Sequence, residues 1–74
     1  MSKLKPIKPD RLIKILEKLG FVQIRRSGSH VILRHQDGRW TTVPMHKGKE
    51  VAKGTLAKVL KDTGLSYEEF ADLN

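Results

Sequence analysis

Two glycine turns in the middle of the chain restrict its fold more than any other feature of the sequence. Ser27-Gly28 separates a β-forming stretch at residues 21–26 from a second at 30–35, and Asp37-Gly38 separates the second from a third at 39–43. Dipeptides of this kind between short runs of β-forming side chains are typical of tight hairpins. The sequence therefore predicts a three-stranded antiparallel meander, ended by the proline that follows residue 43.

A helix is predicted before this meander. Residues 10–19 repeat apolar side chains at helical spacing, with Asp10 as a candidate N-cap and Gly20 as a left-handed stop. The preceding residues are basic and punctuated by proline, without any periodicity.

Two further helices are predicted after the meander. A basic loop at residues 45–53 leads to an apolar stripe that ends at Gly64 and consists of Leu56, Val59, Leu60 and Thr63. Ser66 and Glu69 then form a capping-box pattern, which indicates a short helix at residues 67–73.

This order of elements defines an α+β fold class, α-β-β-β-α with a short C-terminal helix, in a single domain over residues 1–74. A sheet this small is marginal alone, so we expect a two-layer structure with helices on one face and the other face open to solvent. Double-stranded-RNA-binding domains have the same order of elements and recognise RNA largely by shape and backbone contacts.

Charge indicates the kind of partner. The chain carries 15 Lys and Arg against 8 Asp and Glu, a net charge of +7. All the cations lie at or before Lys61, whereas Glu68, Glu69 and Asp72 lie near the C-terminus. A basic body with an acidic tail favours a polyanion partner, most often a nucleic acid, over a domain that is merely soluble and basic.

Several classes of function are excluded or made improbable by what the sequence lacks. Without cysteine the chain has no disulfide, thiolate metal site or cysteine nucleophile, and the spacing of His30, His35 and His46 fits no zinc template. We therefore expect no metal and no small-molecule cofactor. No apolar stretch approaches the roughly 20 residues that span a bilayer, and no signal core precedes the first helix, so we expect a cytoplasmic protein without a membrane partner.

The chemistry that these exclusions leave is acid–base catalysis by a histidine beside cationic side chains. RNA is a natural substrate for it. An imidazole that removes the proton of a 2′-hydroxyl, beside cations that stabilise the charged phosphorane, would cleave the backbone without a metal. His30 is the best placed histidine, since it follows a turn of Ser27, Gly28 and Ser29 that can present N–H groups to a phosphate. The alternative is that His30 is an exposed strand residue without a role.

The remaining candidates follow from strand alternation and charge. His30, Ile32 and Arg34 are expected on one sheet face, and Val31, Leu33 and His35 on the other. His35 is expected to be a solvated hairpin residue, and Trp40 either packs or stacks a base. The predicted RNA-binding residues are Arg25, Arg26, Ser27, Gly28, Ser29, Arg34, His46, Lys47, Lys49 and Lys53.

The motifs in this order resemble the HicA-type (YcfA-like) family of mRNA interferase toxins. They are LxxxGF at 16–21, GSHxxxR at 28–34, the Asp37-Gly38 turn, TVPMHKGKE at 42–50, KGTLAKVLKDTGLS at 53–66 and a final EEF. The resemblance implies a double-stranded-RNA-binding-like fold, ribonuclease activity against mRNA and a HicB-type antitoxin as partner. It also implies that the histidine of GSH, here His30, is catalytic.

Two alternatives remain open from the sequence. One is a non-catalytic RNA-binding module of the same fold, which would bind RNA without cleaving it. The other is a small DNA-binding regulator with a helix-turn-helix, which the apolar character of the helix ending at Gly64 argues against. The sequence does not distinguish single-stranded from double-stranded RNA.

Overall fold

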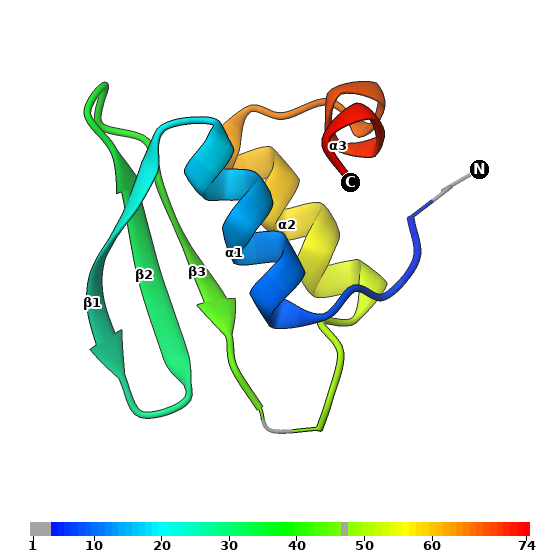
Figure 1. Cartoon of the computed structure of the whole chain (residues 1–74), viewed down its shortest axis with the longest axis horizontal. Coiled ribbons are helices and arrows are strands. Elements are labelled where there is room, and N and C mark those ends of the chain that lie inside the picture. Colours follow the sequence, from blue (N-terminus) through cyan, green and yellow to red (C-terminus); the bar gives the residue numbers. More distant parts are fainter. Residues whose placement is uncertain (1–3, 47) are drawn as a thin grey trace.

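The computed structural model describes residues 4–46 and 48–74 of the chain. The elements follow the predicted order and confirm the α+β fold class (Figure 1). They are α1 (Pro9–Lys18), β1 (Phe21–Ser27), β2 (His30–His35), β3 (Trp40–Pro44), α2 (Lys53–Thr63) and α3 (Tyr67–Leu73).

Helix α1 begins one residue earlier than the sequence predicts. Lys8 is the N-cap, in an extended conformation and without a side-chain cap, and Pro9 occupies the first helical turn. Proline is favoured there because its missing N–H has no partner inside the helix in any case. Asp10 is therefore not the N-cap, and its carboxylate lies in the first turn, where it interacts favourably with the helix dipole.

The three strands form one antiparallel sheet in the order β1-β2-β3. Strand β1 extends to Ser27, which pairs with His30. The connecting turn is therefore Gly28-Ser29, one residue later than predicted, and Gly28 has the positive φ of 57° that such a turn requires. Strand β3 is likewise shifted by one residue and ends at Pro44 instead of before it.

A β-bulge in β1 changes which side chains share the open sheet face. Gln23 pairs with Leu33, but Arg25 pairs with Ile32, so Ile24 is an extra residue in the strand. Beyond the bulge the alternation of β1 is inverted. As a result Arg25 and Ser27, and not Arg26, lie on the face of β2 that carries His30.

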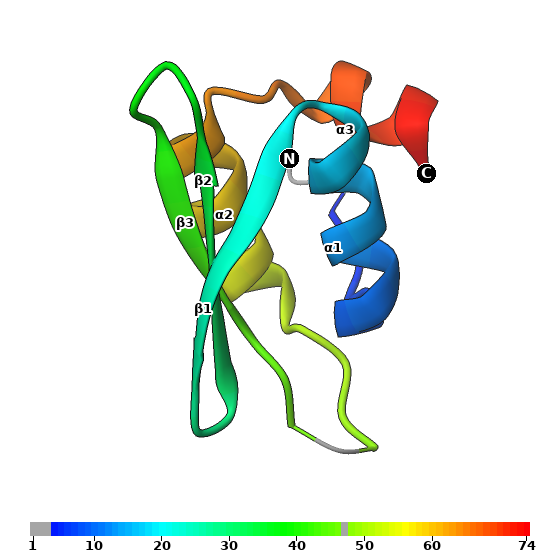
Figure 2. The ribbon, with the colours of Figure 1, turned by 60° about the vertical axis from the view of Figure 1, so that its left-hand side comes forward.

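The core lies between the inner sheet face and the helices, which lie on the same side of the sheet (Figure 2). Its largest fully buried apolar side chains are Leu12 and Leu16 of α1, Phe21, Leu33 and Leu56. The predicted alternation of β2 is confirmed, because Val31 and Leu33 are buried whereas His30 and Arg34 are exposed.

Helix α2 begins at Lys53, which was predicted to end the preceding loop, and it ends at Gly64 in the left-handed conformation with φ 71°. The segment before α1, expected to be irregular, pairs with the segment before α2 through a β-bridge between Ile7 and Val51. Helix α3 has the predicted bounds and capping box, with Ser66 accepting from the Glu69 N–H. Among the described residues, no helix is long and apolar enough to span a membrane.

The adjacent residues Thr41 and Thr42 of β3 offer a matched test of this arrangement. Thr41 is fully buried and its hydroxyl donates to Asp62 Oδ2 at 3.1 Å, whereas Thr42 faces outward. Thr41→Asp should lower the free energy of unfolding by about 3–5 kcal/mol, because it buries a carboxylate beside another. Thr42→Asp should cost about 1 kcal/mol, the loss in β-propensity. Urea unfolding followed by circular dichroism measures both, and equal losses would mean that the face assignment is wrong.

Candidate active site

His30 lies at the start of β2, directly after the Gly28-Ser29 turn, and its side chain is exposed on the open sheet face. Ser27 of β1 and Pro44 of β3 are its two cross-strand neighbours. The turn, the histidine and the open face are thus together, as the sequence predicted. A side chain at this position is accessible to a large substrate that approaches the sheet.

A second histidine lies beside His30. The imidazole rings of His30 and His46 are 6.2 Å apart between centroids and nearly perpendicular, at 78°. His46 reaches this position because the Met45 N–H donates to the Ser29 carbonyl at 2.5 Å, which fastens the loop after β3 to the Gly28-Ser29 turn. Both segments lie at the same end of the molecule (Figures 1 and 2).

The two histidines line a shallow depression of about 500 Å³ between β3 and the start of α2. Its other polar lining includes Thr42 from β3, Glu50 from the loop, and Thr55 and Lys58 from α2. Glu50 and Thr55 were not among the predicted site residues, and Lys58 was noted only as a surface cation. No spacing rule could have found them, because the position of α2 relative to β3 depends on tertiary packing.

The depression carries charges of both signs and lies beside the N-terminus of α2. The N-cap of α2, Ala52, provides no side-chain cap, and the first turn contains no acidic residue, so the N–H groups at this helix end leave a partial positive charge there. Lys58 lies 3.5 Å from Asp62, one turn further along α2, and Glu50 adds one negative charge to the lining. Arg25 and Arg34 form no ion pair within the part of the chain that the structure describes.

The predicted RNA-binding residues lie at different distances from His30. Ser27, Gly28, Ser29 and Arg25 lie close to His30 along the strands and turn. Arg34 shares the face of His30 but lies four residues along β2, roughly 13 Å at 3.3 Å per residue. It is therefore placed to contact a neighbouring nucleotide instead of the phosphate beside His30.

Arg26 lies on the opposite side from Arg25 and lines an adjoining depression of about 480 Å³ together with Met45, His46 and Lys49. His46 therefore belongs to both depressions. Lys53 is exposed at the start of α2 and lines neither of them. Lys47 lies outside the described residues.

His35 is not the solvated hairpin residue that the sequence predicted. Its ring packs edge-on against buried Phe21, with centroids 5.2 Å apart, and its Nδ1 accepts the Asp37 N–H at 3.1 Å. The backbone N–H of Arg39 bonds Asp37 and lowers the pKa of that carboxyl, so Asp37 stays ionised beside the ring. His35 is a structural residue of the β2–β3 hairpin, because its face of the sheet is the covered one.

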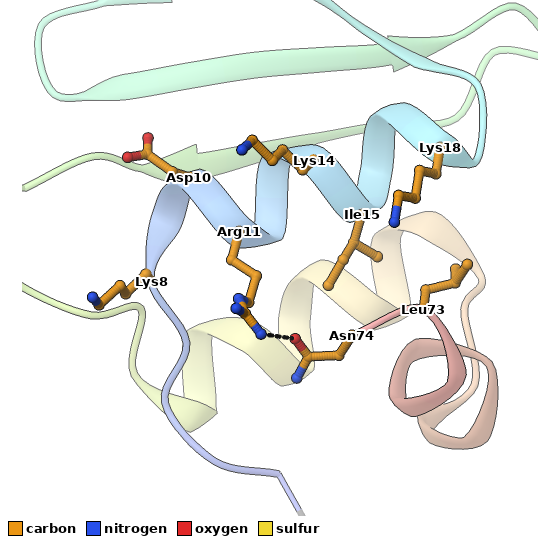
Figure 3. Close-up of a pocket in the computed structure, with 8 residues that line it drawn as sticks. All are labelled: Lys8, Asp10, Arg11, Lys14, Ile15, Lys18, Leu73 and Asn74. Atoms are coloured by element: carbon orange, nitrogen blue, oxygen red, sulfur yellow. Dashed lines mark hydrogen bonds between the residues drawn. The ribbon is translucent and has the colours of Figure 1, made fainter.

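A third depression, of about 440 Å³, lies between α1 and the C-terminus (Figure 3). It has a cationic rim of Lys8, Arg11, Lys14 and Lys18, and Arg11 donates to the Asn74 side chain at 3.2 Å. No histidine lines it. It can attract an anion, but it lacks a group that exchanges protons near neutral pH.

Comparison with known proteins identifies the family. The family described as "HicA toxin of bacterial toxin-antitoxin" matches residues 9–65, which include every strand, α1 and α2. A search of curated proteins found no match. The chain therefore belongs to the HicA toxin family, whose members are the toxin components of bacterial toxin–antitoxin systems and have an antitoxin as partner.

The different surroundings of the three histidines predict different reactivity toward diethyl pyrocarbonate. His30 and His46 are exposed, whereas the His35 ring is packed on Phe21 and uses Nδ1 as an acceptor. Modification mapped by peptide mass spectrometry should therefore be several-fold faster at His30 and His46. If His35 reacts as fast as His30, the hairpin packing described above is wrong.

Proposed function

We propose that the protein is a metal-independent endoribonuclease, an mRNA interferase, in which His30 is an acid–base catalyst. The observation that carries this proposal is the exposed His30 on an open, cation-rich sheet face, at the position of the GSH histidine in the family motif. HicA toxins are in general ribonucleases, which supports the same conclusion. Among the described residues, no group of three or more His, Asp or Glu side chains could hold a metal ion.

The reaction is an internal transesterification. The 2′-oxygen loses its proton to a base and attacks the adjacent phosphorus, so that the O2′–P bond forms. The P–O5′ bond breaks, and the leaving oxygen takes a proton. The products are a 2′,3′-cyclic phosphate and a 5′-hydroxyl, and DNA cannot react because it lacks the nucleophile.

Unpaired RNA fits the open face better than a duplex. Trp40, Val22 and Ile24 are 58%, 61% and 55% exposed, and Arg34 lies between Val22 and Trp40 in the sheet register. An exposed indole beside a guanidinium is a platform on which an unpaired base stacks, with a contribution of about 1–3 kcal/mol per base. Bases within a duplex are already stacked and do not offer their faces to it. The substrate proposed here is therefore single-stranded mRNA.

The partner proposed here is a HicB-type antitoxin that covers the depression. Both depressions that His46 lines are shallow and open on the surface, so the free toxin exposes His30 and His46. An acidic inhibitor surface would be attracted to the cations around them, including Lys49, and would be captured quickly. Occlusion of His30 would then stop cleavage.

Replacing His30 tests the catalytic assignment. His30→Ala should lower the rate of RNA cleavage by about 10²- to 10⁴-fold, the usual contribution of an acid–base group. Because His30 is exposed, the free energy of unfolding should change by less than about 0.5 kcal/mol. Gln36→Ala, at an exposed position of the other hairpin, is the control and should cleave normally, with or without EDTA.

A well-folded His30→Ala protein that cleaves at the parent rate would refute the assignment. If the parent protein binds RNA with a salt-dependent affinity but never cleaves it, the non-catalytic RNA-binding module is the better description. Loss of cleavage in EDTA, restored by magnesium, would point to a metal-dependent mechanism.

Antitoxin binding should depend on charge at one side of the molecule only. Lys49→Glu should slow association with the co-expressed antitoxin by roughly tenfold at low salt, because it reverses a charge beside the covered site. Lys14→Glu, on the cationic rim of the α1 depression, makes the same change in net charge and should have little effect. Stopped-flow or surface-binding kinetics measures both rates.

In the complex, His30 should also be protected from diethyl pyrocarbonate. An inhibited complex in which His30 stays as reactive as in the free toxin would contradict direct occlusion. Equal effects of Lys14→Glu and Lys49→Glu would show that only net charge matters.

A further inference from the structure

We propose that His46 is the second acid–base group of the site, so that His30 and His46 act on opposite sides of one scissile phosphate. This inference rests on the ribonuclease function proposed above and names a second catalytic residue beside the histidine of the GSH motif. The observation behind it is the placement of the two imidazoles, which come from different segments and line the same depression.

The chemistry requires two proton transfers at separate atoms. In an in-line displacement, the attacking 2′-oxygen and the leaving 5′-oxygen lie on opposite sides of the phosphorus. A base placed at the first oxygen therefore cannot also reach the second one in the same step. Cleavage is fastest when an acid stands at the leaving oxygen while the base stands at the nucleophile.

The geometry of the pair fits this requirement. With ring centroids 6.2 Å apart, the two imidazoles are close enough for a single phosphate group to approach both. In the described part of the chain, no hydrogen bond joins the two rings, so their nitrogens remain available to a substrate. The Met45–Ser29 hydrogen bond on one side and a Lys49 N–H to His46 carbonyl bond of 3.0 Å on the other hold His46 in place.

The other titratable groups around the depression are less suitable. Lys58 lines it from α2, but its ammonium lies 3.5 Å from the Asp62 carboxylate. Glu50 lines the same depression from the loop, but its negative charge opposes the approach of a phosphate. On its other side His46 also faces a set of charged groups, namely Lys8, Asp10, Arg26, Lys49 and Glu50. Imidazole is the side chain most often used for acid–base catalysis.

The test compares two RNA substrates that differ at the leaving atom. In one, the bridging 5′-oxygen at the cleavage site is replaced by sulfur, a leaving group that departs without a proton. On normal RNA, His30→Ala and His46→Ala should each lose at least about 100-fold in rate. On the sulfur-bridged RNA, the variant that lacks the acid should regain a rate within about tenfold of the parent, while the variant that lacks the base should stay slow.

The pH profile provides an independent readout. The parent rate should follow a bell-shaped curve with an acidic and a basic limb. Each single variant should keep one limb and lose the other, and the two variants should lose different limbs. Glu50→Gln should keep both limbs, and Gln36→Ala should match the parent in every respect.

The outcomes separate this inference from the function on which it rests. A parent protein that cleaves no RNA overturns the proposed function itself. If His30→Ala is inactive but His46→Ala cleaves at the parent rate, the ribonuclease stands and the role of His46 is refuted. The role is also refuted by a second pattern of results. In this pattern, His46→Ala and His46→Gln are slow but keep the bell-shaped profile, and neither His30→Ala nor His46→Ala recovers on the sulfur-bridged RNA. His46 would then only bind RNA or shape the site.

Discussion

The three-stranded sheet is covered on one face, because the helices pack on the same side of it. Helices α1 and α2 pack on the inner face, where Val31 and Leu33 of β2 are buried, and the opposite face stays in solvent. Every outward position of the strands is therefore available to a partner. The proposed site includes His30 on that face, whereas most of the apolar side chains are buried on the other side.

Two local features bring the residues of the candidate site together on the open face. The bulge at Ile24 inverts the alternation of β1, so that Arg25 joins His30 on the outer face while Arg26 turns toward the loop after β3. The Met45–Ser29 hydrogen bond then draws that loop back to the β1–β2 turn. Together they place cations on both sides of the histidine pair. Neither feature involves a deep cavity, which suits a polymer substrate that is contacted along its length.

The sequence predicted the elements well because their signals are local. Turn glycines, the apolar stripes of the helices and the Ser66–Glu69 capping box all act within a few residues, and they specified the order and placed the boundaries within one residue. The prediction of Asp10 as the N-cap of α1 was wrong, because the preference of Pro9 for the first turn outweighs the capping preference of Asp10. The prediction that His35 is exposed was wrong, because strand pairing places its ring against Phe21 and the distance from the turn does not determine its exposure.

The site was predictable only in part. His30 could be identified from the turn before it and from the family motif. His46 was predicted only as an RNA-binding residue, and its position beside His30 could not be predicted, because a separation of sixteen residues does not indicate contact. The bulge that places Arg25 instead of Arg26 on the outer face contains no glycine or proline that would indicate it in the sequence. The position of Thr55 and Lys58 in the lining depends on how α2 packs beside β3.

The most direct test of the account is a nuclear magnetic resonance titration with a short RNA that cannot be cleaved because the reactive 2′-hydroxyl is replaced by hydrogen. The account predicts that the imidazole signals of His30 and His46 shift together, along with the Trp40 indole, while the backbone signals of α1 stay in place. If the largest shifts instead map to Lys14 and Lys18 around the α1 depression, and the two histidines do not respond, the open sheet face is not the RNA site.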